Sequence, residues 1–389
     1  MEARWQALLV LTAARTSLGV QFQSVASVSP QLIDQAGLLF ADLGTLIGLY
    51  FAPGILVALP GGALGRRFGD RRVVLAGLAL MAAGGIVMAL APGFAVLAAG
   101  RTISGIGAVL LNVVMAKMVT DWFAGREIVL AMSVFVNSFP VGIGLALLVL
   151  TPLGAALGWP AVMVAASLLA LAALLLIALA YRPHPHDGAG AASGGRLSGA
   201  EVALVSLAGI GWAVLNGGLA VTFGFTPTFL ASLGRSAAEA GVLVGAVTWL
   251  GAVSVQAGGV LAQRGTSPAL LMAAGSLGWA GCFAVLASGA APPGVALVAA
   301  GLLMGLPAGV LLSLPGRVLR PENRSLGMGL FYTWLYAGFA TMPPAAGWLR
   351  DWTGSPAAPL WFTAALVPGM FLAFCAFQAG LARRARAPA

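Results

Sequence analysis

RPHPHDGAGAASGGRLSG, residues 182–199, is the longest polar stretch of the chain. Its proline, glycine and serine content is typical of a flexible linker. On each side of it, turn residues and charges divide the sequence into six apolar segments of about 20 residues, the length that a helix needs to cross a membrane. We therefore expect an all-α membrane protein with twelve transmembrane helices in two six-helix bundles, residues 1–181 and 200–389, joined by a linker at 182–199.

The composition excludes a soluble globular protein. Of the 389 residues, 60% are apolar and 8% are charged, whereas about 25% are charged in an average soluble domain. The net charge of +9 does not indicate nucleic-acid binding, because the basic residues lie in short links between apolar segments. The two cysteines lie far apart in apolar segments, and the only two histidines lie in the linker. We therefore expect no disulfide, no metal site and no cofactor.

The spans are expected near residues 5–28, 41–63, 73–91, 94–118, 127–150, 159–181, 200–230, 239–262, 269–289, 294–318, 325–347 and 358–380. If both termini are cytoplasmic, sixteen of the twenty basic residues fall in cytoplasmic links and tails, while Arg235 and Arg350 fall outside. This asymmetry is what the positive-inside rule predicts. We expect a multi-pass protein of a bacterial inner membrane with both termini in the cytoplasm.

The remaining two basic residues, Arg15 and Arg101, lie within apolar spans. An arginine at the centre of a bilayer costs about 2.5–3.5 kcal/mol on insertion scales, so packing, pairing or function has to compensate. All eleven carboxylates fall at span ends, in links or in the N-terminal tail. This pattern predicts a buried cationic site for an anion. Two alternatives remain open: Arg15 pairs with Asp42, or Arg101 is structural and bonds backbone carbonyls.

Other polar and aromatic residues predict where such a site lies. Arg101, Gly105, Ala108 and Asn112 share one stripe of the fourth span, which fits either a substrate-facing surface or close helix packing. We expect substrate-binding residues on several spans: Arg15, Arg101, Asn112, Asn137, Trp212, Asn216, Tyr332 and Tyr336. The aromatic residues among them are equally compatible with core packing. A small organic anion with an apolar body would match the cationic and aromatic groups together.

The link after the second span, GALGRRFGDRR at residues 62–72, resembles the signature of the major facilitator superfamily. The matching positions are Gly62, Leu64, Arg67, Gly69, Arg71 and Arg72. Arg66 stands where the family usually has a carboxylate, and Asp70 is a candidate to replace it. The fourth span, with AAGRTISGIG at residues 98–107, is similar to the family's arginine motif. Residues 23–32, together with Arg15, resemble the cyanate and nitroimidazole permease branch.

This resemblance implies two pseudo-symmetric bundles that move a small molecule by alternating access, with the substrate near the midplane between them. It also implies a conformational gating motif comprising Gly62, Arg67, Gly69, Asp70 and Arg71. We expect a monomeric permease for a small anion in the lipid bilayer, and not an enzyme, because the deep polar residues provide no nucleophile with a base. The alternatives are efflux of drugs or other amphipathic compounds, and a transport-inactive sensor or assembly factor.

Overall fold

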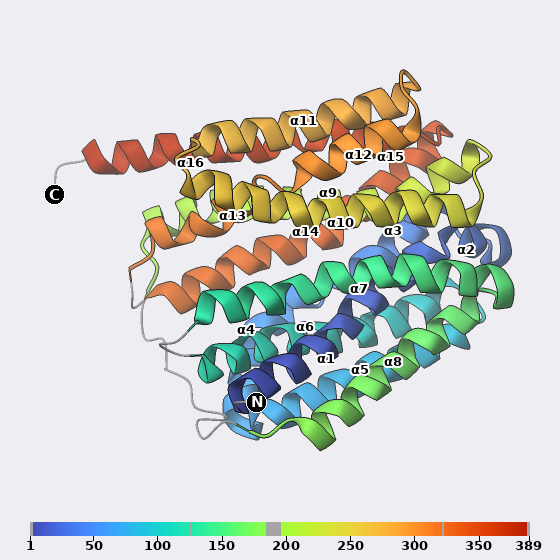
Figure 1. Cartoon of the computed structure of the whole chain (residues 1–389), viewed down its shortest axis with the longest axis horizontal. Coiled ribbons are helices and arrows are strands. Elements are labelled where there is room, and N and C mark those ends of the chain that lie inside the picture. The colour runs from blue at the N-terminus through green and yellow to red at the C-terminus, as the bar shows by residue number, and fades with distance from the viewer. Residues whose placement is uncertain (1–2, 124–126, 184–195, 321–322, 387–389) are drawn as a thin grey trace.

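The computed structural model describes residues 3–123, 127–183, 196–320 and 323–386, and these residues form helices without strands (Figure 1). Most of the linker, including His184 and His186, lies outside the described residues. The first half of the chain forms α1 (Ala3–Ser27), α2 (Ser29–Ala36), α3 (Phe40–Leu49), α4 (Gly54–Phe68), α5 (Asp70–Ala89), α6 (Phe94–Trp122), α7 (Ile128–Leu157) and α8 (Trp159–Ala180).

The second half forms α9 (Gly199–Ser232), α10 (Ala237–Gln263), α11 (Pro268–Ser288), α12 (Pro293–Met304), α13 (Ala308–Ser313), the 3-10 turn η1 (Pro315–Arg317), α14 (Arg324–Thr353), α15 (Ala358–Leu366) and α16 (Pro368–Arg386). These helices match the twelve expected spans. Three spans are each broken into shorter helices, as α3 and α4, as α12 and α13, and as α15 and α16. The short helix α2, which follows α1, was not expected from the sequence.

Proline explains the breaks only in part. Pro53, Pro307 and Pro368 lie at the three breaks, where the missing backbone donor interrupts the helical hydrogen bonds. Pro140 and Pro227 instead lie inside the continuous helices α7 and α9. Neighbouring helices can support a proline-containing helix in a membrane protein. The tertiary surroundings therefore decide which prolines break a span.

Ten of the described helical spans are long and apolar enough to cross a membrane by length and composition. α1 and α14 are not among these ten, and both carry polar groups along their length, such as Arg15 in α1 and Arg350 in α14. Both helices lie where the two halves of the chain meet, so part of their surface faces protein and not lipid. Their polarity follows from that position.

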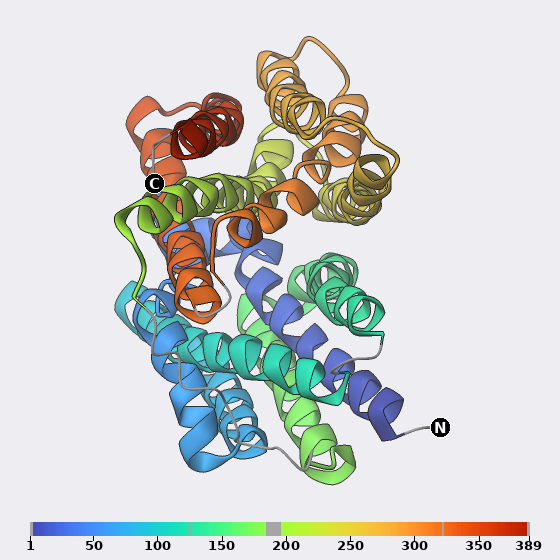
Figure 2. The ribbon, with the colours of Figure 1, turned by 90° about the vertical axis from the view of Figure 1, so that its left-hand side faces the viewer.

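Figures 1 and 2 show the helices of the first half (blue to green) gathered beside those of the second half (yellow to red). The halves meet mainly where α3 and α4 pack on α14, where α7 packs on α10, and where α1 and α2 pack on α9. Both termini lie toward one end of the molecule, which we call the termini end, and α2 lies at the opposite end.

The halves touch most closely toward the opposite end. A Cβ at Gly44 in α3 would overlap the carbonyl oxygen of Pro343 in α14, and one at Gly347 in α14 would overlap that of Phe40 in α3. These glycines let two backbones approach without side chains between them. The opposite end is therefore tightly closed between α3 and α14.

Candidate functional site

The side chain of Arg15 extends from α1 toward α6 and α7 and is 8% exposed. Its Nη1 donates to the carbonyls of Phe135 and Val136, both at 3.0 Å, and to Ser138 Oγ at 3.2 Å. Its Nη2 and Nε donate to Asn112 Oδ1, at 3.0 and 3.3 Å. In the described part of the chain, all hydrogen-bond partners of Arg15 are neutral. No acidic side chain among them neutralises the positive charge of the guanidinium.

Asn112 connects Arg15 to the other half of the chain. Its side chain lies beside that of Tyr336 in α14, and Tyr332, one turn earlier, lies near the guanidinium. The structure thus brings together four of the expected site residues, Arg15, Asn112, Tyr332 and Tyr336, from α1, α6 and α14. They form a polar network across the junction of the two halves, which we call the Arg15 network.

Arg101 is placed differently. It is completely buried, and its three nitrogens donate to the carbonyls of Gln21, Phe22 and Leu46 at 2.7–2.9 Å. Leu46 belongs to the last turn of α3, whose final carbonyls have no partner within the helix. The guanidinium also lies over the ring of Tyr50, 4.4 Å from its centroid. Arg101 therefore joins α6 to α1 and to the broken end of α3, which is the structural alternative for this residue.

The residues of the predicted stripe on α6 also divide between helix packing and the Arg15 network. A Cβ at Gly105 would lie 2.6 Å from the carbonyl oxygen of Tyr50, so this glycine serves close packing. Only Asn112, at the end of the stripe, reaches the Arg15 network. The alternative pair between Arg15 and Asp42 does not form, because the Asp42 carboxylate accepts from the backbone N–H of Leu39 at 3.0 Å.

The remaining expected residues form no hydrogen bond with this network in the described part of the chain. Trp212 in α9 stacks on Phe331, whose ring meets Tyr332 edge-on, and its indole N–H is buried with no hydrogen-bond partner in the described residues. Asn216 donates to the carbonyl of Trp212 in its own helix. Asn137 lines a cleft of about 470 Å³ between α7 and α10, together with Gln256. Val136, whose carbonyl accepts from Arg15, lines the same cleft.

Sequence reasoning missed an aromatic cluster beside the network, made of Phe22, Tyr50, Phe51, Phe139, Tyr336 and Phe339. Phe51 and Phe339 bring the two halves together, with ring centroids 4.7 Å apart. Arg15 lies 5.9 Å from the ring centroid of Phe139. The cluster adjoins the Arg15 network and closes the space between α1, α7 and α14. The only signal in the sequence was the shared face of Tyr332, Tyr336 and Phe339.

A second missed feature joins the halves at the opposite end. The carboxylate of Asp351, in the last turn of α14, accepts from the backbone N–H groups of Phe40 and Ala41 at 3.0 and 2.7 Å. These donors belong to the first turn of α3, where a helix presents unpaired N–H groups and a partial positive charge. Beside them, Arg350 lies over the Phe40 ring and donates to Thr228.

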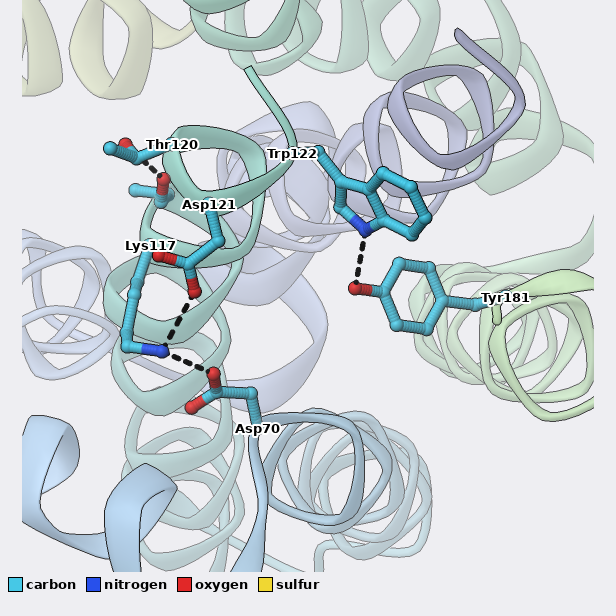
Figure 3. A network of polar contacts seen from close by, with 7 residues as sticks. Asp70, Lys117, Thr120, Asp121, Trp122 and Tyr181 are labelled. Atoms are coloured by element: carbon cyan, nitrogen blue, oxygen red, sulfur yellow. Dashed lines mark hydrogen bonds and ion pairs between the residues drawn. The ribbon is translucent and has the colours of Figure 1, made fainter. Parts of the chain in front are cut away.

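The expected gating motif lies at the termini end, where α4 gives way to α5. Gly69 has φ 86°, a conformation that favours glycine, and the turn that it forms starts α5 at Asp70. The Asp70 carboxylate is 1% exposed and accepts from Lys117 Nζ at 2.6 Å, while Lys117 also bonds Asp121 at 2.8 Å (Figure 3). Arg71 donates to the carbonyl of Ala178.

Two other members of the expected motif lie in α4. Arg67 is exposed and lies over the Phe68 ring. Gly62 is helical, and the side chain of Arg66 lies outside the described residues. The ion pairs of Asp70 and Lys117 thus connect α5 to α6 within the first half of the chain.

The Arg15 network carries a positive charge and several hydrogen-bond donors. It presents a guanidinium, two phenolic hydroxyls and an amide, and the nearby Trp212 adds an unpaired N–H donor. Among the described residues, no acidic side chain forms an ion pair with these groups. A guanidinium can bind a carboxylate with two parallel hydrogen bonds.

A protein-family model described as Major Facilitator Superfamily matches residues 10–315. A search of curated proteins found no match. Among solved structures, a bacterial homologue of the human lysosomal transporter Spinster, in an inward-facing and occupied conformation, superposes with a TM-score of 0.77 at 17% identity, covering 98% of this chain and 97% of that one.

The nucleoside transporter NupG superposes with a TM-score of 0.76 at 14% identity, covering 97% of this chain and 100% of the other. A D-xylose-proton symporter superposes with a TM-score of 0.75 at 16% identity, covering 95% and 96%. Identities this low establish the fold and not the substrate. With the family model covering most of its length, the chain belongs to the Major Facilitator Superfamily and is a multi-pass membrane transporter, not an enzyme.

Proposed function

We propose that this transporter carries a small organic anion across the bacterial inner membrane by alternating access, and that Arg15 binds the negative charge of the substrate. The observation that carries the proposal is the set of neutral partners around the Arg15 guanidinium. A permanent charge at this depth is costly, and an anionic substrate supplies the missing counter-charge.

The residues around Arg15 favour an anion over a cation. Tyr332, Tyr336 and Trp212 all present hydrogen-bond donors, and a cation would find no carboxylate among them. The adjoining aromatic cluster offers apolar surface from both bundles for the body of the substrate. A small carboxylate with an apolar body fits this combination.

We infer that the termini end faces the cytoplasm, because sixteen of the twenty basic residues belong to that side. The cleft of about 470 Å³ is lined by Ile128 near the start of α7 and by Gln256 near the end of α10, both toward the termini end. The opposite end is closed by α3 and α14. The described conformation is then the inward-facing one, and the protein acts as a monomer with its binding site between residues 1–181 and 200–389.

Ligand-induced thermal stabilisation of the purified full-length protein tests the proposal. A ligand that binds the folded protein raises its melting temperature with concentration. Small carboxylates, cyanate and nitrate are compared with cationic dyes, and hits are repeated on Arg15→Gln. We expect anions to stabilise the wild-type protein. They should lose this effect in Arg15→Gln, because the variant removes the buried positive charge.

Arg350→Gln is the matched control, because Arg350 is also 8% exposed but lies at the opposite end of the molecule. It should retain the stabilisation by anions. Uptake of the best-binding anion, radiolabelled, into proteoliposomes should likewise be lost in Arg15→Gln and retained in Arg350→Gln. Stabilisation by cationic dyes alone would favour the efflux of amphipathic compounds and reject the anion proposal, as would an Arg15→Gln variant that binds anions normally.

A further inference from the structure

At the opposite end, a cavity of about 150 Å³ lies between the two bundles and away from the Arg15 network. Its polar lining comes from Ser27, Gln31 and Thr151, and apolar residues such as Pro227 and Ala240 form the wall on the other side. Ser27 Oγ, Gln31 Oε1 and Thr151 Oγ1 are all buried without a hydrogen-bond partner in the described residues. Three residues with buried, unpaired oxygens therefore line one small space.

These oxygens differ from most other buried hydroxyls of the protein. Ser24, Ser29 and Thr228 each donate to a carbonyl of their own helix or of the preceding turn, at 2.8–3.0 Å. Ser27 and Thr151, each 7% exposed, form no such bond. A buried oxygen left without a partner costs about 1–3 kcal/mol. The loss is recovered if the cavity holds a group that binds all three.

The backbone at the cavity adds a favourable field for positive charge. α1 ends at Ser27, and α2 begins at Ser29, so the cavity lies at the C-terminal end of a 25-residue helix. The C-terminal end of a helix carries a partial negative charge. In transporters with discontinuous membrane helices, such ends and neutral oxygens coordinate sodium ions.

The lining also limits the kind of ligand. An amide oxygen such as Gln31 Oε1 can only accept a hydrogen bond or coordinate a cation. Divalent cations usually require carboxylate ligands, and the cavity lining contains none. An anion would meet acceptor oxygens and the negative helix end. Arg15 is twelve residues earlier in α1, about 18 Å along the helix axis, too far to repel a small cation strongly.

We propose that Ser27, Gln31 and Thr151 bind a monovalent cation of the size of Na⁺ at the break between α1 and α2. The cavity has room for the ion and a few waters, since each water takes about 30 Å³. Gln31 lies close to α7, the helix that carries Thr151, because a Cβ at Gly154 in α7 would be 3.2 Å from Gln31 Oε1. The oxygens come from one bundle and the facing wall from the other, so the proposed ion lies between the two bundles.

The site supplies a coupling ion for the transport proposed above, and this consequence rests on that proposed function. An Na⁺ bound at one end and an anion bound at Arg15 would move together with little net charge. Cation binding itself does not depend on the identity of the substrate. It can therefore be measured with no anionic substrate present.

The test measures the melting temperature of the full-length protein in NaCl, KCl and choline chloride at equal ionic strength. We expect Na⁺ to raise it saturably by about 2–4 °C relative to choline. Ser27→Ala and Thr151→Val should lose this rise. In choline these two variants should be as stable as the wild-type protein or more stable, because each removes an unpaired buried hydroxyl.

Thr222→Val is the matched control, since Thr222 is also buried with an unpartnered hydroxyl but does not line the cavity. It should retain the full response to Na⁺. A wild-type protein that melts at the same temperature in all three salts would show that the cavity holds water only, and the proposal would fail. An Na⁺ response that survives in both Ser27→Ala and Thr151→Val would also overturn it. Anion binding at Arg15, measured in choline, is unaffected by either result.

Discussion

Asp351→Asn tests the contact that closes the opposite end. In the wild-type protein the carboxylate of Asp351 accepts two hydrogen bonds, at 3.0 and 2.7 Å, from the first turn of α3 in the other bundle. Asparagine keeps one acceptor oxygen, but its NH₂ group faces the second N–H. Bonds to a charged group contribute about 1.5–3 kcal/mol in general, and favourable charge at a helix start a further 0.3–1 kcal/mol.

Because Asp351 is exposed, solvent screens part of this interaction, and we take a net loss of about 1–2 kcal/mol. Such a loss changes a two-state equilibrium by a factor of about 5–30. The ratio of closed to open molecules at the opposite end should fall by this factor in Asp351→Asn. No change in the Arg15 network is expected, since that network lies elsewhere on α14.

Double electron–electron resonance between spin labels at Gln35→Cys in α2 and Leu233→Cys after α9 measures the opening, in a background without Cys282 and Cys375. Asp351→Asn should add a population with longer label distances. Asp34→Asn is the control, because Asp34 is an exposed carboxylate in α2 that forms no ion pair within the described chain. Identical distance distributions in wild-type and Asp351→Asn proteins would refute the closing role of this carboxylate.

Two further substitutions follow from the packing. Arg101→Lys should lower the melting temperature strongly, because one ammonium group cannot bind all three carbonyls on α1 and α3. Each buried carbonyl left unpaired costs about 1–3 kcal/mol. A melting temperature within about 2 °C of the wild type would contradict this structural role. Gly44→Ala should open the opposite end, because its Cβ would overlap the carbonyl oxygen of Pro343 in the closed state, and unchanged label distances in the same resonance experiment would count against it.

The sequence predicted the spans well because membrane insertion depends on local properties. Length, apolar content and the positions of charges are visible in any stretch of about 20 residues, and the predicted spans match the helices apart from the breaks and α2. Breaks were harder to predict. Pro53 lies at the break between α3 and α4, whereas Pro140 lies inside the continuous helix α7, although both lie in apolar surroundings. The difference depends on neighbouring helices, which a single segment does not reveal.

The same reasoning explains what could be said of the two deep arginines. Their depth, and the absence of deep carboxylates, were evident from the residue order. Their partners depend on how each helix is rotated and which helix lies next to it. Arg101 meets the carbonyls of α1 and α3, whereas Arg15 meets Asn112, which lies beside Tyr336 of the other bundle.

The sequence by itself determined a twelve-span transporter with uncompensated positive charge in its membrane spans, because hydrophobicity and charge act residue by residue. Only the tertiary structure decided that Arg101 stabilises the first bundle while Arg15 faces the junction of the two. It also decided that α3 and α14 close one end, and that three unpaired oxygens share a cavity there. Contacts of this kind join residues up to about 310 positions apart, and their geometry exists only once the helices have packed.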